Sequence, residues 1–169
     1  MKKIAIQSTN GFEHSELTGP QKYFIDAGHE VTVISPEPES IEAAHEEGSV
    51  AVDLLLADAN PADYDALILP GGQVNPDILR MNKHALTFIK HFTDAQKPVA
   101  AICHAPWLLI EAGVVSGKQM TSWPSLKTDL VNAGAIWVDE AVVTTGNIVT
   151  SRNPDDIPAF NDAFAALLR

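Results

Sequence analysis

The sequence predicts an α/β fold in which a mostly parallel sheet carries helices on both faces. Short runs of aliphatic and β-branched residues alternate along the chain with helical stretches. Such alternation is typical of parallel strands joined by right-handed crossovers. Two of the runs, 65–69 and 98–102, are almost wholly apolar, as expected of strands that are covered on both faces.

The first predicted elements end at recognisable signals. The strand Lys3–Gln7 leads into the loop Ser8-Thr9-Asn10-Gly11, and a helix follows over 15–27, where Gly28 stops it. Prolines close the next strand, 30–35. Residues 37–62 are predicted to be irregular, with an edge strand or hairpin near 50–56.

The remaining chain continues the alternation. The predicted elements are strand 65–69, helix 82–95, strand 98–102, helix 105–112, a short strand 120–122, helix 124–133, strands 142–145 and 147–151, and a terminal helix 154–168. Sites in such folds lie at the carboxyl ends of strands. The candidate loops are therefore those that follow strands 3–7, 65–69 and 98–102.

Size and charge limit the classes of function. With 169 residues and 18.2 kDa, residues 1–169 are expected to form a single domain. The net charge of −11 provides no basic patch for phosphates, so we expect no direct binding of nucleic acid. No stretch is apolar enough to span a membrane. The single cysteine excludes an internal disulfide and favours a reducing cytoplasm.

No metal or cofactor is expected. The HExxH, GxGxxG and P-loop patterns are all absent. His45 and His14 each lie beside glutamates, but no second histidine follows at helical spacing.

The strongest chemical signal is Cys103, which directly follows an apolar strand and precedes a helix. Small residues, Ala101 and Ala105, flank it, as a nucleophile elbow requires. The following helix N-terminus favours a thiolate, and His104 is placed to exchange a proton with it. The alternative is a buried structural cysteine.

Two further loops are expected beside this cysteine. The N–H groups of Gly71 and Gly72 are candidates to stabilise an oxyanion, although such a pair is also common in ordinary turns. In the loop after the first strand, Glu13 and Glu16 are acidic. A carboxyl group beside a thiolate needs a raised pKa; otherwise these glutamates are solvated or cap the helix.

Together these segments resemble the ThiJ/PfpI family, and in particular its PfpI-type branch of intracellular cysteine peptidases and general stress proteins. The resemblance covers the whole chain and is carried by Leu69-Pro70-Gly71-Gly72, Ala101-Ile102-Cys103-His104-Ala105-Pro106, Gly11-Phe12-Glu13 and Ser151-Arg152-Asn153-Pro154-Asp155-Asp156. It implies a flavodoxin-like three-layer sandwich with the architecture of class I glutamine amidotransferases. Those enzymes use a histidine far downstream of the cysteine, and none follows His104 here.

The resemblance also implies roles for single residues and an assembly. Cys103 is then the nucleophile, His104 its partner, and Glu13 the acidic residue that hydrogen-bonds the thiol. Asp77 is the best match to an acidic residue that orients the histidine of a neighbouring subunit, although its spacing from Gly72 is one residue longer than in the peptidase pattern. A homodimer is expected, or a hexamer.

Three functions remain open at this point. The first is a cysteine-dependent enzyme that acts on a small reactive carbonyl, a glycated group or a peptide, with the activities of a glyoxalase, deglycase or peptidase. The second is a redox-responsive stress chaperone or sensor whose cysteine is oxidised to a sulfinate. The third is a flavodoxin-like binding module with an inert cysteine.

Overall fold

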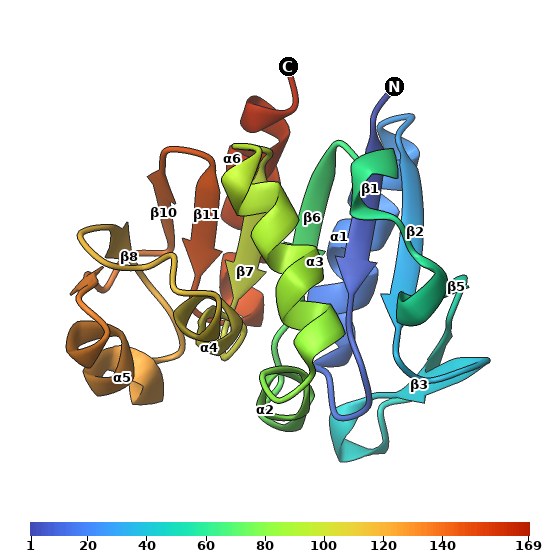
Figure 1. The fold of residues 1–169 in the computed structure, drawn as a ribbon, viewed down its shortest axis with the longest axis horizontal. Coiled ribbons are helices and arrows are strands. Elements are labelled where there is room, and N and C mark those ends of the chain that lie inside the picture. Colours follow the sequence, from blue (N-terminus) through green and yellow to red (C-terminus); the bar gives the residue numbers. More distant parts are fainter.

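A computed structural model describes all residues, 1–169, and is organised around one seven-stranded sheet (Figure 1). The order of the strands is β10-β11-β7-β6-β1-β2-β5. Their bounds are Val142–Thr145 for β10, Ile148–Ser151 for β11, Val99–Ile102 for β7, Ala66–Leu69 for β6, Lys3–Gln7 for β1, Glu30–Ser35 for β2 and Leu54–Leu55 for β5. Every neighbouring pair is parallel except the hairpin of β10 and β11. The prediction of a mostly parallel sheet is confirmed.

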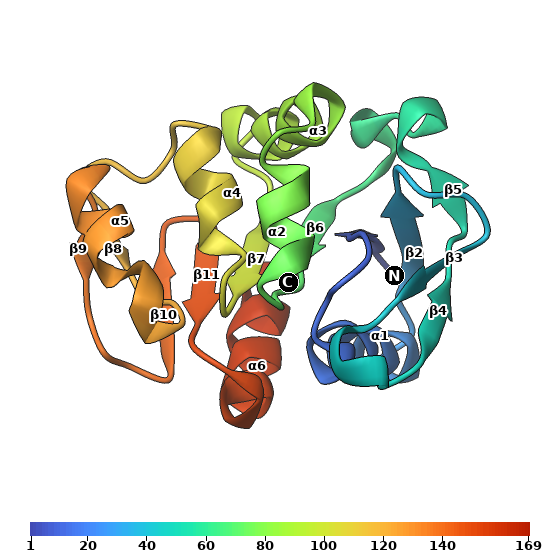
Figure 2. The ribbon, with the colours of Figure 1, turned by 90° about the horizontal axis from the view of Figure 1, so that it is seen from below.

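Helices cover both faces of this sheet. They are α1 (His14–Asp26), α2 (Val74–Leu79), α3 (Lys83–Asp94), α4 (Pro106–Glu111), α5 (Lys127–Asn132) and α6 (Ile157–Leu167). Figure 2 shows α1 and α6 on one face and α2, α3 and α4 on the other. None of the helices is long and apolar enough to cross a lipid bilayer.

The two faces of the sheet bury separate apolar clusters. In β1, Ile4 and Ile6 belong to the cluster that includes Phe24 of α1 and Phe164 of α6, whereas Ala5 belongs to the cluster under α3 and α4. Successive residues of a strand point to opposite faces, so a central strand must be apolar on both. This explains why the central strands lack a polar alternation and why the molecule has three layers.

Several short elements differ from the prediction. The irregular region contains a hairpin of β3 (Ser40–Glu42) and β4 (Ser49–Ala51) ahead of the edge strand β5, and β8 (Gln119–Met120) pairs with an unpredicted β9 (Ile136–Trp137). Helix α2 was also not predicted. Elements this short contain too few residues to show a hydrophobic period.

The order of the strands brings three loops together. Strand β6 lies between β1 and β7, and all three are parallel. Their carboxyl ends therefore share one edge of the sheet, where the loops after Gln7, Leu69 and Ile102 meet.

Candidate active site

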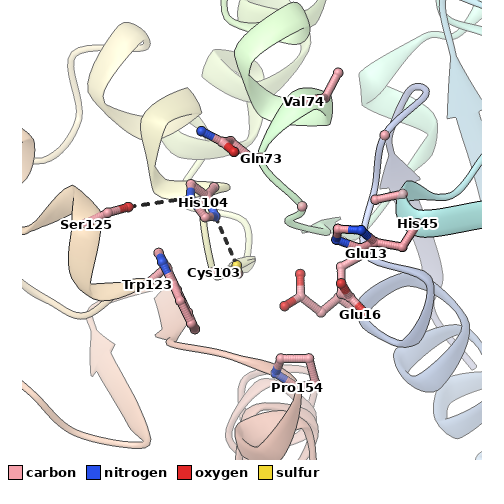
Figure 3. Close-up of a pocket in the computed structure, with 13 residues that line it drawn as sticks. Glu13, Glu16, His45, Gln73, Val74, Cys103, His104, Trp123, Ser125 and Pro154 are labelled. Carbon is pink, nitrogen blue, oxygen red and sulfur yellow. Dashed lines mark hydrogen bonds between the residues drawn. The ribbon is translucent and has the colours of Figure 1, made fainter.

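An open pocket of about 630 Å³ lies at this edge of the sheet (Figure 3). It is lined by Gly11, Glu13, Glu16, Ala44, His45, Gly72, Gln73, Val74, Cys103, His104, Trp123, Ser125 and Pro154. Residues from all three predicted loops are present, so the expectation that these loops form one site is confirmed.

Cys103 sits on a strained turn between β7 and α4. Its φ is +64°, a left-handed conformation that costs a non-glycine residue roughly 1–2 kcal/mol. Its N–H donates to the Ser151 carbonyl at 3.0 Å, and its own carbonyl accepts from the Trp123 N–H at 2.9 Å. These bonds hold the bend that brings the sulfur to the pocket, although the residue is only 7% exposed.

The two glycines of the second loop are required by close contacts. A Cβ on Gly71 would lie 2.6 Å from the Cβ of Cys103 and 2.7 Å from the Ile102 carbonyl oxygen. Gly72 has a φ of +77°, and a Cβ there would lie 2.7 Å from the Glu13 nitrogen. Only glycine allows the loop to approach the cysteine so closely.

The carboxyl group beside the thiol belongs to Glu16, so the prediction that Glu13 hydrogen-bonds the thiol is wrong. Glu16 is fully buried; its Oε2 accepts a hydrogen bond from the Gly71 N–H at 2.9 Å, and its carboxyl group interacts with the Cys103 thiol, whose pKa its charge raises. Glu13 is instead the half-buried N-cap residue of α1. Its Oε1 accepts a long 3.5 Å bond from the Ser15 hydroxyl.

A signal for Glu16 was present in the sequence. Glu16, Pro20 and Phe24 are spaced by four residues and share the buried face of α1. Glu13 precedes the helix and therefore does not follow that periodicity. The acid that reaches the sulfur is the one on the buried face of α1, and not the one nearer in sequence to Gly11.

Burial couples the protonation of Glu16 to that of Cys103. Burial raises the pKa of the Glu16 carboxyl to about 8. The hydrogen bond from the Gly71 N–H lowers this pKa, and the negative charge of Glu13 raises it further. Burial and the negative charge of Glu16 also raise the pKa of the Cys103 thiol, whereas the N–H groups of Gly72 and His104 lower it.

Burial of the sulfur opposes the thiolate, and the protonation state of Glu16 decides whether repulsion by a negative charge adds to that opposition. At pH 7 a carboxyl group with a pKa of about 8 is mostly protonated. A protonated Glu16 exerts no repulsion and donates a hydrogen bond to the sulfur, which favours the thiolate. Glu16 and Cys103 thus titrate as a coupled pair, and the state in which the two groups hold one proton between them is favoured over the state in which both are charged.

His104 lies against the sulfur on its other side. Its Nδ1 is 3.1 Å from the Cys103 Sγ, and its Nε2 is 3.4 Å from the Ser125 hydroxyl oxygen. Burial lowers the pKa of the imidazole, so at neutral pH the ring is mostly uncharged and can accept a proton. The rings of Trp107 and Trp123 pack around it.

Two other predicted site residues, Gly71 and Asp77, do not line the pocket. The Gly71 N–H is engaged by Glu16, so Gly71 positions the acid and is not an oxyanion donor; Gly72 and His104 direct their N–H groups at the sulfur. Asp77 is exposed on α2 and does not line the pocket. Its role toward a neighbouring subunit stays a prediction.

Ser125 and Trp123 line the pocket but were not among the predicted site residues. Tryptophans are more often core or interface residues, yet Trp123 is 41% exposed and forms one wall of the pocket. Neither residue follows a strand of the seven-stranded sheet, so the rule that sites lie at the carboxyl ends of parallel strands does not predict them. No group of three or more His, Cys, Asp or Glu side chains is arranged to hold a metal ion.

Comparison with known proteins decides the family. The model of the DJ-1/PfpI family matches residues 2–167. The chain belongs to the DJ-1/PfpI family. This confirms the resemblance that was inferred from the cysteine and glycine motifs.

Curated relatives of this family member are similar over nearly their whole length. General stress protein 18 of Bacillus subtilis is 47% identical, with 99% of this chain and 98% of the relative covered. Protein/nucleic acid deglycase 2 of Escherichia coli is 44% identical, with the same coverage. The putative cysteine protease YraA of Bacillus subtilis is 43% identical, with 99% of each chain covered.

Solved structures agree with the fold. DJ-1beta of Drosophila melanogaster superposes with a TM-score of 0.91 at 30% identity, over 98% of this chain and 90% of that one. The predicted flavodoxin-like arrangement is confirmed.

Proposed function

We propose that this protein is a stress-protective cysteine enzyme that removes small reactive carbonyls or the glycated groups that they form. The observation that carries the proposal is the position of the Cys103 sulfur, on a strained bend between a buried carboxyl group and an uncharged imidazole. This arrangement supplies a nucleophile together with a proton donor and a proton acceptor.

The reaction that these groups support is the conversion of methylglyoxal to lactate. The thiolate forms a C–S bond to the aldehyde carbon, and the carbonyl oxygen takes the proton of Glu16. His104 then takes the proton from that carbon and delivers it to the neighbouring ketone carbon, while Glu16 carries the hydroxyl proton to the ketone oxygen. The product is a lactoyl thioester, formed without an external oxidant. Water hydrolyses the C–S bond, releases lactate and returns the thiol.

A glycated amine or thiol gives the same thiohemiacetal by displacement instead of addition. The C–S bond forms as the bond from carbon to the amine nitrogen or thiol sulfur breaks, and the leaving group takes a proton. The N–H groups of Gly72 and His104, which are aimed at the sulfur, are placed to stabilise negative charge on the adjacent oxygen. The names of relatives as deglycase and stress protein are consistent with this chemistry.

A second candidate is a redox sensor or stress chaperone without turnover. Oε1 of Glu16 is buried without a nitrogen or oxygen partner, and a protonated carboxyl there is suited to donate to a sulfinate oxygen of oxidised Cys103. Peptide cleavage is a further reading, which the name of YraA supports.

We extend the proposal to the assembly and the location of the protein. Val74, Ile78 and Met81 of the α2 region are 50%, 39% and 76% exposed, and Asp77 lies among them. Association of two chains through this surface would cover apolar area and bring Asp77 toward a second copy, in a dimer or a hexamer. A reducing cytoplasm would keep Cys103 available.

The decisive experiment compares the purified wild type with Cys103→Ala on methylglyoxal, a glycated thiol and a fluorogenic peptide. We expect the substitution to abolish carbonyl consumption, by about 10³-fold or more, while the far-UV circular dichroism is unchanged. Retention of full activity by Cys103→Ala would refute the nucleophile. Selective oxidation of Cys103 by mild peroxide, with no turnover of any of the substrates, would favour the sensor.

A further inference from the structure

The most buried ion pair of the chain joins Arg152 to Asp156, in the turn between β11 and α6. The carboxylate of Asp156 is only 5% exposed. It accepts two bonds from the guanidinium of Arg152, from Nε to Oδ2 at 2.9 Å and from Nη2 to Oδ1 at 3.0 Å. A buried carboxylate needs such partners, and the two-pronged contact fixes its orientation.

The same carboxylate also binds the main chain next to the cysteine. Its Oδ2 accepts the backbone N–H of Arg152 at 3.0 Å. That N–H belongs to the same peptide unit as the Ser151 carbonyl, and this carbonyl accepts the N–H of Cys103 at 3.0 Å. A peptide unit is planar and rigid. Asp156 is therefore connected to the backbone of Cys103 through a single peptide group.

The connection matters because the conformation of Cys103 is strained. Its φ of +64° is unfavourable for a residue with a side chain, so the surrounding structure has to hold it. Hydrogen bonds in a chain polarise one another, so an amide that donates to a carboxylate accepts more strongly at its own carbonyl. The charge of Asp156 therefore strengthens the bond that the Ser151 carbonyl accepts from Cys103.

We propose that Asp156 is a positioning residue for Cys103, which acts through the Ser151–Arg152 peptide unit, and that Arg152 holds the carboxylate in the required orientation. The proposal deepens the proposed function and rests on it only in taking Cys103 as the reacting group. Asp156 does not line the pocket, whereas Pro154 of the same turn does (Figure 3). The effect of Asp156 on the sulfur is therefore indirect.

The orientation of the bend decides which donors the sulfur meets. The N–H groups of Gly72 and His104 lower the pKa of the Cys103 thiol. Hydrogen bonds to the charged form favour that form, and they weaken steeply once the atoms are misaligned. Release of the Ser151 carbonyl would let the sulfur move away from these donors, so less of it would be thiolate at a given pH.

A purely structural role for the ion pair has the opposite signature. Removal of one partner of a buried pair destabilises a protein, and unfolding would expose Cys103 as an ordinary thiol. Burial raises the pKa of this thiol in the folded protein, so the exposed thiol would ionise at lower pH. Destabilisation alone would therefore speed alkylation of the cysteine, whereas loss of positioning slows it.

The test follows alkylation of Cys103 by iodoacetamide as a function of pH, with the intact mass as the readout. Cys103 is the only cysteine, so every adduct is assigned to it. Wild type, Asp156→Ala, Asp156→Asn and Asp139→Ala are compared well below their unfolding temperatures. Asparagine keeps an oxygen for the Arg152 N–H. Asp139→Ala is the matched control, because Asp139 accepts from Nη1 of the same guanidinium at 3.0 Å but has a 68% exposed side chain.

We expect Asp156→Ala to slow alkylation at a fixed pH by about tenfold and to move the midpoint of the pH–rate profile to higher pH. Asp156→Asn should bring the rate back to within about threefold of the wild type, and Asp139→Ala should stay within about twofold. An unchanged or faster rate in Asp156→Ala, no recovery in Asp156→Asn, or an equal loss in Asp139→Ala would overturn the proposal.

A measurement on the wild type covers the case in which Asp156→Ala does not fold. Amide hydrogen exchange reports the opening of the two backbone bonds separately. Because one peptide unit joins both bonds, the protection factors of the Arg152 and Cys103 amide protons should agree within about tenfold. A larger difference would show that the bonds open independently, and the positioning role would be refuted.

Alkylation and exchange need no turnover, so they separate this proposal from the proposed function. If both behave as expected but methylglyoxal is not consumed, the positioning role stands and the enzymatic function fails. If methylglyoxal is consumed and Asp156→Ala consumes it at the wild-type rate, the enzymatic function stands and the positioning role fails.

Discussion

Each end of the central sheet has a pocket, and the two pockets differ in the partners of their polar groups. At the carboxyl end, the pocket of about 630 Å³ contains a strained cysteine, a buried acid and an imidazole. At the opposite end, a cleft of about 440 Å³ is lined by Lys90, Lys97 and Lys118 together with the hairpin residue Gly146.

The charged groups of the second cleft are largely used by the fold. Lys97 donates to the Tyr64 carbonyl at 2.7 Å, and Lys90 pairs with Asp94 at 3.0 Å. In the first pocket, by contrast, Glu16 has a buried oxygen without a nitrogen or oxygen partner, and its pKa is raised to about 8. The comparison teaches that unsatisfied and perturbed groups indicate chemistry.

The largest expected effect that sharpens this comparison is that of Glu16→Gln. Glutamine keeps an acceptor for the Gly71 N–H but cannot exchange a proton with the sulfur or the substrate. We therefore expect methylglyoxal turnover to fall by about 10²–10⁴-fold, with steady-state kinetics as the measurement. Turnover within twofold of the wild type would show that this carboxyl group moves no proton.

The pH dependence of the same pair of proteins has a defined sign. Folding raises the pKa of Glu16 above its usual value, so the stability linked to its proton is present at low pH and is lost as the pH rises toward about 8. Wild-type activity that needs this proton should decline only as the pH passes about 8, where the folded protein loses it. The free energy of unfolding of Glu16→Gln should change less than that of the wild type between pH 5 and pH 9, as measured by urea unfolding.

A pair of glycine substitutions compares the two ends directly. Gly71→Ala forces a Cβ against Cys103 and the Ile102 carbonyl, so we expect a loss of about 1–3 kcal/mol in stability and at least about tenfold in turnover. At Gly146, φ is +57° and a Cβ would meet no atom within 4 Å. Gly146→Ala should cost only about 1 kcal/mol of backbone strain.

Thermal unfolding and turnover of both variants are the measurements. Gly146→Ala should retain wild-type turnover because the second cleft takes no part in the chemistry. A loss of turnover in Gly146→Ala as large as that in Gly71→Ala would break the distinction between the two ends.

The smallest expected effect is that of Ser125→Ala. Its hydroxyl lies 3.4 Å from the Nε2 of His104 and is exposed, so it positions the imidazole only weakly. We expect kcat to fall by roughly two- to fivefold with KM unchanged, and Ser125→Thr, which keeps a hydroxyl, to restore it. Lys97→Met, in the second cleft, should leave kcat unchanged. A higher KM with an unchanged kcat in Ser125→Ala would contradict the positioning role.

Much of the site was predictable because local sequence and sheet topology specify it. Cys103 follows a strand that is apolar on both faces, and Gly71 follows its neighbour in the sheet. The rule that ligands bind at the carboxyl ends of parallel strands then places both residues together. Trp123 and Ser125 were not reached by that rule, since they come from a segment outside the seven-stranded sheet.

The sequence by itself determined the alternation of strands and helices, the parallel sheet and the bend that presents Cys103, because these depend on residue type and spacing along short stretches. Only the tertiary structure decided that Glu16, and not Glu13, reaches the sulfur. The reason is physical: the two acids are three residues apart, and packing of α1 against the sheet sets the rotation that buries one and leaves the other at the rim.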